Sequence, residues 1–190
     1  SCPFHFRRLC KLGRQAAPLV VGGQMQPMHL ALLSTLFLLR EVESGTAVAS
    51  SWSFDHADKE LTWNLPGSKT DPMALGTSRT WGCLCDLPEF ACPYHLAVEH
   101  FDWLQRHPLY RPGPVFPLFP TECGNHAPKA KVVETFELLG TLLGQPLVSP
   151  DGLRLFGGHT ARVTGAQTFA VAGLEVNKIR ILARHSGDTI

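Results

Sequence analysis

The chain has 190 residues, of which 44% are hydrophobic and 17% are charged. This composition suffices for one domain with a buried core and excludes a disordered polyelectrolyte. The 17 basic and 16 acidic side chains give a net charge of +1, so bulk charge does not by itself indicate a nucleic-acid-binding protein. No apolar run reaches the roughly 18 residues that a membrane span requires.

The pattern of apolar residues predicts a mainly α-helical fold with a small antiparallel β-sheet. Residues 1–26 are basic and then rich in Gly and Gln, and we interpret them as a tail or the remnant of an upstream region. Helical spacing and short alternating runs bounded by turn residues predict the other elements. The expected helices cover residues 27–43, 93–106, 129–143, 159–172 and 176–185, and the expected strands 47–54, 61–65 and 79–84. Apolar residues lie nearly all round the first of these helices, which predicts that it is buried at the centre.

The six cysteines are spread unevenly, with three of them between positions 83 and 92. This is not the dense framework of a small secreted domain, and the start, SCPFHFRRLC, has no apolar signal-peptide core. We therefore expect an intracellular, reducing compartment, either nucleus or cytoplasm. Neither end has the features of a natural terminus, so we interpret the sequence as a piece of a longer protein.

Two cationic side chains on one predicted helix open the functional interpretation. His159 and Arg162 are three residues apart and project from the same helix face. An arginine beside a buried face needs an anionic partner, and phosphate suits it because the guanidinium fork binds two oxygens at once. Alone, this spacing is too short to be specific, since a surface histidine and a salt-bridged arginine would give the same pattern.

Further segments make the pattern more specific. Residues 39–43 read LREVE, residues 65–70 read LPGSKT, and residues 157–190 contain GGHTARVTGAQTFAVAG and end in ARHSGDTI. Together they resemble the tyrosine recombinases, the phage-integrase family. The resemblance covers about residues 28–190 and implies that residues 27–190 are the catalytic domain of such a protein. The upstream core-binding domain of the family is not evident.

The resemblance implies phosphoryl transfer to DNA without a cofactor. In this family a tyrosine attacks a DNA phosphate, forms a 3′-phosphotyrosine link and expels a 5′-hydroxyl. Arg40 and Arg162 would bind the nonbridging oxygens as charge develops on them. Lys69 would be the general acid for the leaving 5′-oxygen. His159 would assist proton transfer at the nucleophile, and His185 would donate a hydrogen bond to the phosphate.

Glu43 lies one helical turn beyond Arg40 and matches the acidic position of the family that orients a neighbouring basic group. Two of these assignments have ordinary alternatives. Glu43 could be a helix-end salt-bridge partner, and Lys69 could be a solvated loop lysine, because Pro66-Gly67 already marks a turn.

The chain departs from the family pattern at the nucleophile. The catalytic tyrosine of the family lies about nine residues past the position of His185, which is beyond Ile190. The two tyrosines present, Tyr94 and Tyr110, match no motif of the family. We expect Tyr94 to be a packing residue and Tyr110 to be a loop residue. The resemblance therefore predicts that these 190 residues bind DNA without forming the covalent link.

Cys83, Cys85, Cys92 and His95 form a second constellation, with four potential metal ligands within 13 residues. Zinc accepts such a set of ligands, but the spacing is not that of a standard zinc finger. The alternative is structural: a pair of strand cysteines, a buried cysteine at a helix start and an exposed histidine. The sequence favours the structural interpretation and leaves zinc open.

The expected partner is DNA, with self-association in a synaptic complex implied by the family and no membrane contact. A recombinase catalytic domain is the first functional hypothesis. The second is a DNA-binding or regulatory module without catalysis, and an in-frame tyrosine shortly beyond Ile190 would discriminate the two. A zinc-stabilised interaction domain ranks last, because it does not explain the group formed by Arg40, Lys69, His159, Arg162 and His185.

Overall fold

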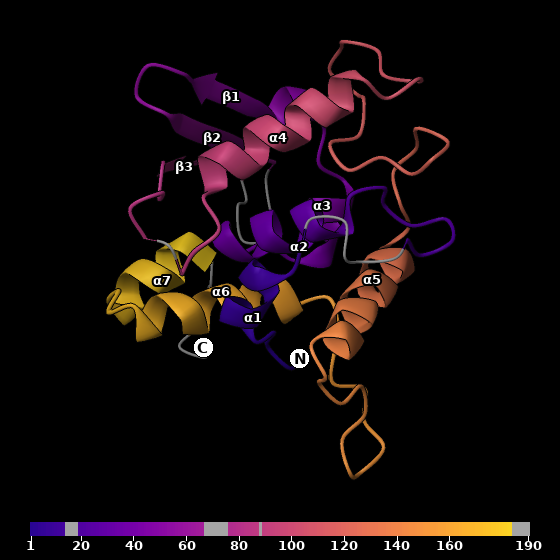
Figure 1. The fold of residues 1–190 in the computed structure, drawn as a ribbon, viewed down its shortest axis with the longest axis vertical. Coiled ribbons are helices and arrows are strands. Elements are labelled where there is room, and N and C mark those ends of the chain that lie inside the picture. The colour runs from indigo at the N-terminus through magenta and orange to yellow at the C-terminus, as the bar shows by residue number, and fades with distance from the viewer. Residues whose placement is uncertain (14–18, 67–75, 88, 184–190) are drawn as a thin grey trace.

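The computed structural model describes residues 1–13, 19–66, 76–87 and 89–183 (Figure 1). The helices are α1 (Phe6–Lys11), α2 (Pro27–Leu36), α3 (Glu41–Gly45), α4 (Pro93–Gln105), α5 (Lys129–Leu142), α6 (Thr160–Val171) and α7 (Val176–Ala183). The strands are β1 (Trp52–Asp55), β2 (Glu60–Leu65) and β3 (Thr77–Gly82), and a 3₁₀ turn covers Ala49–Ser51. The predicted fold class, mainly α-helical with a small antiparallel sheet, is confirmed. Within the described residues, no helix is long and apolar enough to cross a membrane.

Helix α2 is the central element of the core, as predicted. All ten of its residues are buried, and it packs against both α4 and α6. Figure 1 shows it between the sheet with α4 on one side and α6 with α1 on the other. Burying one leucine side chain contributes about 1.5–3 kcal/mol, so this leucine-rich helix is a principal source of stability.

The single helix predicted over residues 27–43 is wrong, because the structure has two helices separated by a sharp break. Helix α2 ends at Leu36, Leu38 has a positive φ of 52°, and α3 begins at Glu41. No Gly or Pro lies in the break, and the apolar period continues through it. The local sequence therefore carries no signal for the interruption.

Side chains from distant elements stabilise this break. Three consecutive carbonyl oxygens each accept a hydrogen bond: Leu36 from the indole of Trp81, Phe37 from the guanidinium of Arg79, and Leu38 from that of Arg162. Two of these donors come from β3 and one from α6. The backbone groups released by ending α2 are thus satisfied by tertiary contacts, and the next helix starts with Arg40 as its N-cap.

The three strands form one antiparallel sheet in the order β1-β2-β3. Trp63 of β2 faces Trp52 of β1 and Arg79 of β3 in the register. Its fully buried ring lies 5.1 Å from that of Phe37, which joins the sheet to the end of α2. Helix α4 lies across the sheet in Figure 1 and contacts β2 and β3. In the strand predicted over 47–54, residues Ala49–Ser51 form the 3₁₀ turn instead, and β1 begins at Trp52.

The N-terminal segment belongs to the same core. Phe4, Phe6 and Leu9 are buried, and the ring of Phe4 packs against those of Phe136 and Phe156 at 5.7 and 5.6 Å. These side chains are therefore part of the core, and the interpretation of residues 1–26 as a tail or an upstream remnant stays a prediction. The domain boundary at residue 27 stays a prediction.

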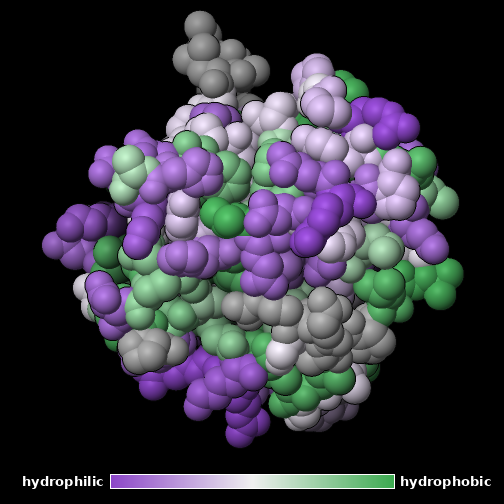
Figure 2. Space-filling view, turned by 45° about the horizontal axis from the view of Figure 1, so that its top comes forward, coloured by the Kyte–Doolittle hydropathy of each residue, from purple (hydrophilic) through white to green (hydrophobic). Residues whose placement is uncertain are grey.

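The outer surface is polar and mixed on the face shown in Figure 2. Hydrophilic side chains form a band across the middle of this view, with smaller groups of hydrophobic side chains around it. The net charge of the whole chain is only +1. Any strongly cationic site must therefore be local.

Candidate functional site

Glu43 joins two arginines at the junction of α3 and α6. Its Oε2 accepts hydrogen bonds from Nη2 of Arg162 and from the backbone N–H of Arg40, each at 2.7 Å. Its Oε1 lies 3.5 Å from Nη2 of Arg40. The side chains of Glu43 and Arg162 are each only 7% exposed, whereas that of Arg40 is 27% exposed. Because two guanidinium groups share one carboxylate, this arginine–glutamate cluster keeps an excess of positive charge.

The position of Arg162 depends on the close packing of α6 against the end of α2. Its Nε donates to the carbonyl of Leu38 at 3.0 Å, and its Nη2 is bound to Glu43. A Cβ at Gly165 would overlap the carbonyl of Thr35, so a glycine is required for this approach. Two hydrogen bonds on different edges of the guanidinium fix its plane.

His159 is the N-cap of α6 and is exposed. Partial desolvation of its ring lowers its pKa from the ordinary value of 6.5, and the positive charges of Arg162 and Arg40 lower it further, against an opposing effect of Glu41. These electrostatic interactions place His159 beside the arginine–glutamate cluster. The imidazole is therefore neutral at pH 7 and can accept a proton.

Glu41 was not predicted, and it links α3 to the loop before α6. Its backbone N–H donates to the carbonyl of Gly158 at 2.9 Å, and its Oε1 pairs with Lys129 at 2.8 Å. A Cβ at Gly158 would overlap the Glu41 carboxylate. The glycine before His159 is thus needed for the close contact between α3 and the loop.

The structure brings together four of the predicted site residues: Arg40, Glu43, His159 and Arg162. Their catalytic roles stay predictions. Lys69 and His185, the other two, lie outside the described residues. Arg79 was missed as a buried cation: it is 6% exposed and donates to the carbonyl of Phe37. The alternation of β3, which puts it on the same face as Trp81, was the available signal.

The two tyrosines have structural contacts, as expected. Tyr94 is buried on α4, and its hydroxyl lies 2.8 Å from Nδ1 of His56. Tyr110 lies in the connector after α4 and packs edge-on against Phe116 at 5.2 Å.

The cysteine–histidine cluster, meaning Cys83, Cys85, Cys92 and His95, is brought together at the surface. Nδ1 of His95 lies 3.2 Å from Sγ of both Cys85 and Cys92 and 3.7 Å from Sγ of Cys83. The expected pair of strand cysteines is wrong, because β3 ends at Gly82 and both cysteines lie in the turn after it.

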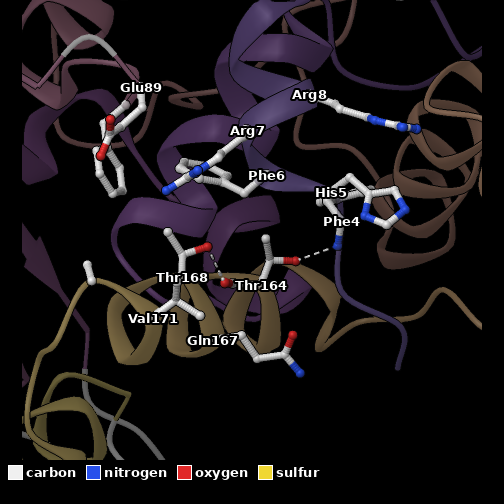
Figure 3. Close-up of a pocket in the computed structure, with 12 residues that line it drawn as sticks. Phe4, His5, Phe6, Arg7, Arg8, Glu89, Thr164, Gln167, Thr168 and Val171 are labelled. Atoms are coloured by element: carbon white, nitrogen blue, oxygen red, sulfur yellow. Dashed lines mark hydrogen bonds between the residues drawn. The ribbon is translucent and has the colours of Figure 1, made fainter.

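A cavity of about 510 Å³ lies between α1 and α6 (Figure 3). Its α6 wall includes Thr164, Thr168 and Val171. At about 3.6 residues per turn, these side chains project from the side of the helix roughly opposite to Arg162. Figure 3 shows Arg7 of α1 above these side chains, and the backbone N–H of Phe4 donating to Thr164 at 2.8 Å. The cavity and the arginine–glutamate cluster therefore lie on opposite faces of α6.

Comparison with solved structures identifies the architecture. The XerH site-specific recombinase bound to its difH substrate matches with a TM-score of 0.66 and 12% identity, over 96% of this chain and 44% of that one. The Tn1549 transposon integrase in complex with a circular intermediate DNA matches with a TM-score of 0.55 and 12% identity, over 96% of this chain and 55% of that one. The chain has a tyrosine-recombinase catalytic-domain-like fold.

Sequence comparison adds nothing to this structural likeness: no family model and no curated protein matches the chain. At 12% identity the likeness shows the fold alone, and the chain spans about half the length of the matched structures. The recombinase-like fold predicted from the motifs is confirmed.

Proposed function

We propose that the chain is the DNA-binding catalytic domain of a site-specific recombinase or integrase, which breaks and rejoins DNA through a 3′-phosphotyrosine intermediate. The observation that carries this proposal is the buried Glu43 carboxylate, which positions Arg40 and Arg162 side by side in a fold shared with DNA-bound recombinases. Two guanidinium groups positioned in this way suit the nonbridging oxygens of one phosphate.

The proposed chemistry uses charges that are oriented before the substrate arrives. Arg40 and Arg162 would stabilise the negative charge that develops on the phosphate, without a reorganisation cost, because Glu43 already fixes their geometry. The lowered pKa of His159 would allow its neutral imidazole to take a proton from the attacking hydroxyl. The resemblance further implies Lys69 as the general acid and His185 as a phosphate hydrogen-bond donor.

These 190 residues would bind DNA but would not form the covalent link, because Tyr94 and Tyr110 are engaged in packing elsewhere. The test incubates the chain with a nicked suicide substrate and examines it by denaturing gel and peptide mass spectrometry. No adduct is expected. An adduct mapped to Tyr94 or Tyr110 would contradict the assignment of the site.

The second candidate is a DNA-binding or regulatory module without catalysis. The two candidates differ in the behaviour of the full-length protein. Cleavage that requires Arg162 would support the recombinase, whereas binding without cleavage would support the module. In both, the partner is DNA, the site of action is nucleus or cytoplasm, and self-association on DNA is part of the recombinase proposal.

Arg40 offers the cleanest test of phosphate binding, because it is the more exposed of the two arginines. When Arg40 is replaced, the ion pair between Glu43 and Arg162 is kept. Arg40→Ala should weaken binding to every DNA sequence similarly and reduce the slope of log K against log salt by about one. The matched control is Arg154→Ala, since Arg154 is exposed and pairs with Glu137 at 2.7 Å. Equal effects of the two variants in fluorescence anisotropy would refute a specific role of the cluster.

A further inference from the structure

The cysteine–histidine cluster is a compact donor set that the proposed DNA chemistry does not use. Cys83 and Cys85 lie in the turn after β3, Cys92 is the N-cap of α4, and His95 lies in its first turn. The three Sγ atoms and Nδ1 of His95 all lie within 4.8 Å of one another. We propose that these four side chains bind one structural Zn²⁺ ion.

Four of the six separations are close to those of a tetrahedral zinc site. Bonds of about 2.3 Å to sulfur and about 2.0–2.1 Å to nitrogen place tetrahedral ligand atoms roughly 3.5–3.8 Å apart. The sulfurs of Cys83 and Cys92 are 3.7 Å apart, and Nδ1 of His95 lies 3.2–3.7 Å from all three sulfurs. The two remaining pairs both involve Cys85 and are no longer than 4.8 Å. In the proposed site, the exposed Cys85 side chain would move closer to the other sulfurs to complete the tetrahedron.

Hydrogen bonding alone does not explain this arrangement. A single imidazole nitrogen has one proton or one lone pair, yet Nδ1 of His95 lies within 3.7 Å of three sulfurs at once. A central cation gives every one of these atoms a bond. Three soft thiolates with one imidazole in tetrahedral geometry select zinc among the common metals.

The surroundings fit a thiolate-bound metal. The backbone N–H of Leu84 donates to Sγ of Cys92 at 3.2 Å, which is a typical outer contact of a zinc-bound thiolate. Lys59, in the turn between β1 and β2, acts electrostatically on Cys83. Its positive charge would offset the excess negative charge of three thiolates on one divalent ion.

The proposed ion would stabilise the connection from β3 to α4. Phe90 in this connection packs against Phe6 of α1 with ring centroids 6.2 Å apart, so the same loop covers the N-terminal helix. Bound zinc would therefore couple the sheet, α4 and α1. Without it, chymotrypsin should cleave more readily next to Leu87 and Phe90.

Zinc content is the direct test, and the chain provides a matched pair of exposed cysteines. Protein purified without chelator under reducing conditions should contain one zinc per chain, and the cobalt(II) form should show tetrahedral thiolate absorption. Cys85→Ser should bind zinc at least about 100-fold more weakly, since even outer-shell changes cost roughly 10–100-fold. Cys123→Ser, which changes the other exposed cysteine, should keep one zinc and the same affinity.

Three results would overturn the proposal. The first is a wild-type protein that binds no stoichiometric zinc when zinc is supplied, and the second is equal zinc affinity in Cys85→Ser and Cys123→Ser. The third is a Cys83–Cys92 disulfide under reducing conditions, which would lower the mass by two hydrogens. If Cys85→Ser does not fold, His95→Ala replaces it, because His95 is exposed. None of these measurements involves DNA, so the zinc site and the proposed recombinase function can fail independently.

Discussion

The arginine–glutamate cluster and the cysteine–histidine cluster are built in opposite ways. The first is buried, and its ion pair joins Glu43 and Arg162, which are 119 residues apart in the sequence. The second lies at the surface, and its ligand atoms come from one continuous segment of 13 residues. The buried cluster balances part of its positive charge through the Glu43 carboxylate, whereas the surface cluster has four donors that converge on one point. Removing a partner should therefore destabilise the first, and removing a metal should destabilise the second.

The largest effect is expected for Glu43→Gln, which removes the carboxylate that binds Arg162 while keeping the side-chain shape. Breaking a buried ion pair leaves an uncompensated charge and costs about 3–5 kcal/mol. We expect the free energy of unfolding in urea to fall by that amount. The fold should weaken most at the junction of α3 and α6.

The matched control for this variant is Glu134→Gln. Glu134 also accepts from a cation, Lys131 at 2.7 Å, but both side chains are partly exposed. Such surface pairs contribute about 0–1 kcal/mol, so its stability should stay near that of the wild type. A similar loss in both variants would show that burial does not distinguish the two ion pairs.

Chelation should produce the next largest effect, and it should act on the surface cluster alone. A ligand present at about 100 times its Kd stabilises a protein of this size by roughly 5–10 °C in Tm. Adding a strong chelator should lower the Tm of the wild type by that amount and leave Cys85→Ser unchanged. A chelator-insensitive wild type that nevertheless contains zinc would separate metal binding from stability.

The same contrast explains how much could be predicted from the sequence. The helices beginning at Pro93 and Lys129 were predicted to within one or two residues, because their amphipathic period is local. The members of the cysteine–histidine cluster could also be predicted, because they lie within one short segment of the sequence. The break before Arg40 could not be predicted from the sequence. The carbonyl groups of Phe37 and Leu38 accept hydrogen bonds from Arg79 and Arg162, which are 42 and 124 residues away in the sequence. The pairing of buried charges, such as Glu43 with Arg162, likewise depends on packing between segments that are far apart in the sequence.

His100 provides a third case for comparison. It is a buried ionisable group that is neutral and has no charge to be balanced by an ion pair. It is completely buried between α2 and the connector, where its Nε2 lies 2.7 Å from the carbonyl of Leu118 and its Nδ1 lies 3.2 Å from Nδ1 of His29. His29 in turn lies 3.3 Å from Glu99. Burial lowers the pKa of His100 from 6.5 to about 3, opposed by the Leu118 hydrogen bond and assisted by His29.

This lowered pKa predicts an acid-dependent loss of stability of about 2 kcal/mol between pH 7 and pH 5, the smallest of the three effects. The unfolded state binds the proton first, so the stabilisation is present above pH 6.5 and is lost as the pH falls towards the folded-state pKa of about 3. His100→Gln, compared in urea at both pH values, should lose about 2 kcal/mol less than the wild type. His5→Gln, which changes an exposed histidine, should keep the wild-type dependence. If all three proteins lose the same free energy, protonation of His100 does not control acid unfolding, and the carboxylates of the buried ion pairs, Glu43 among them, become the groups to test.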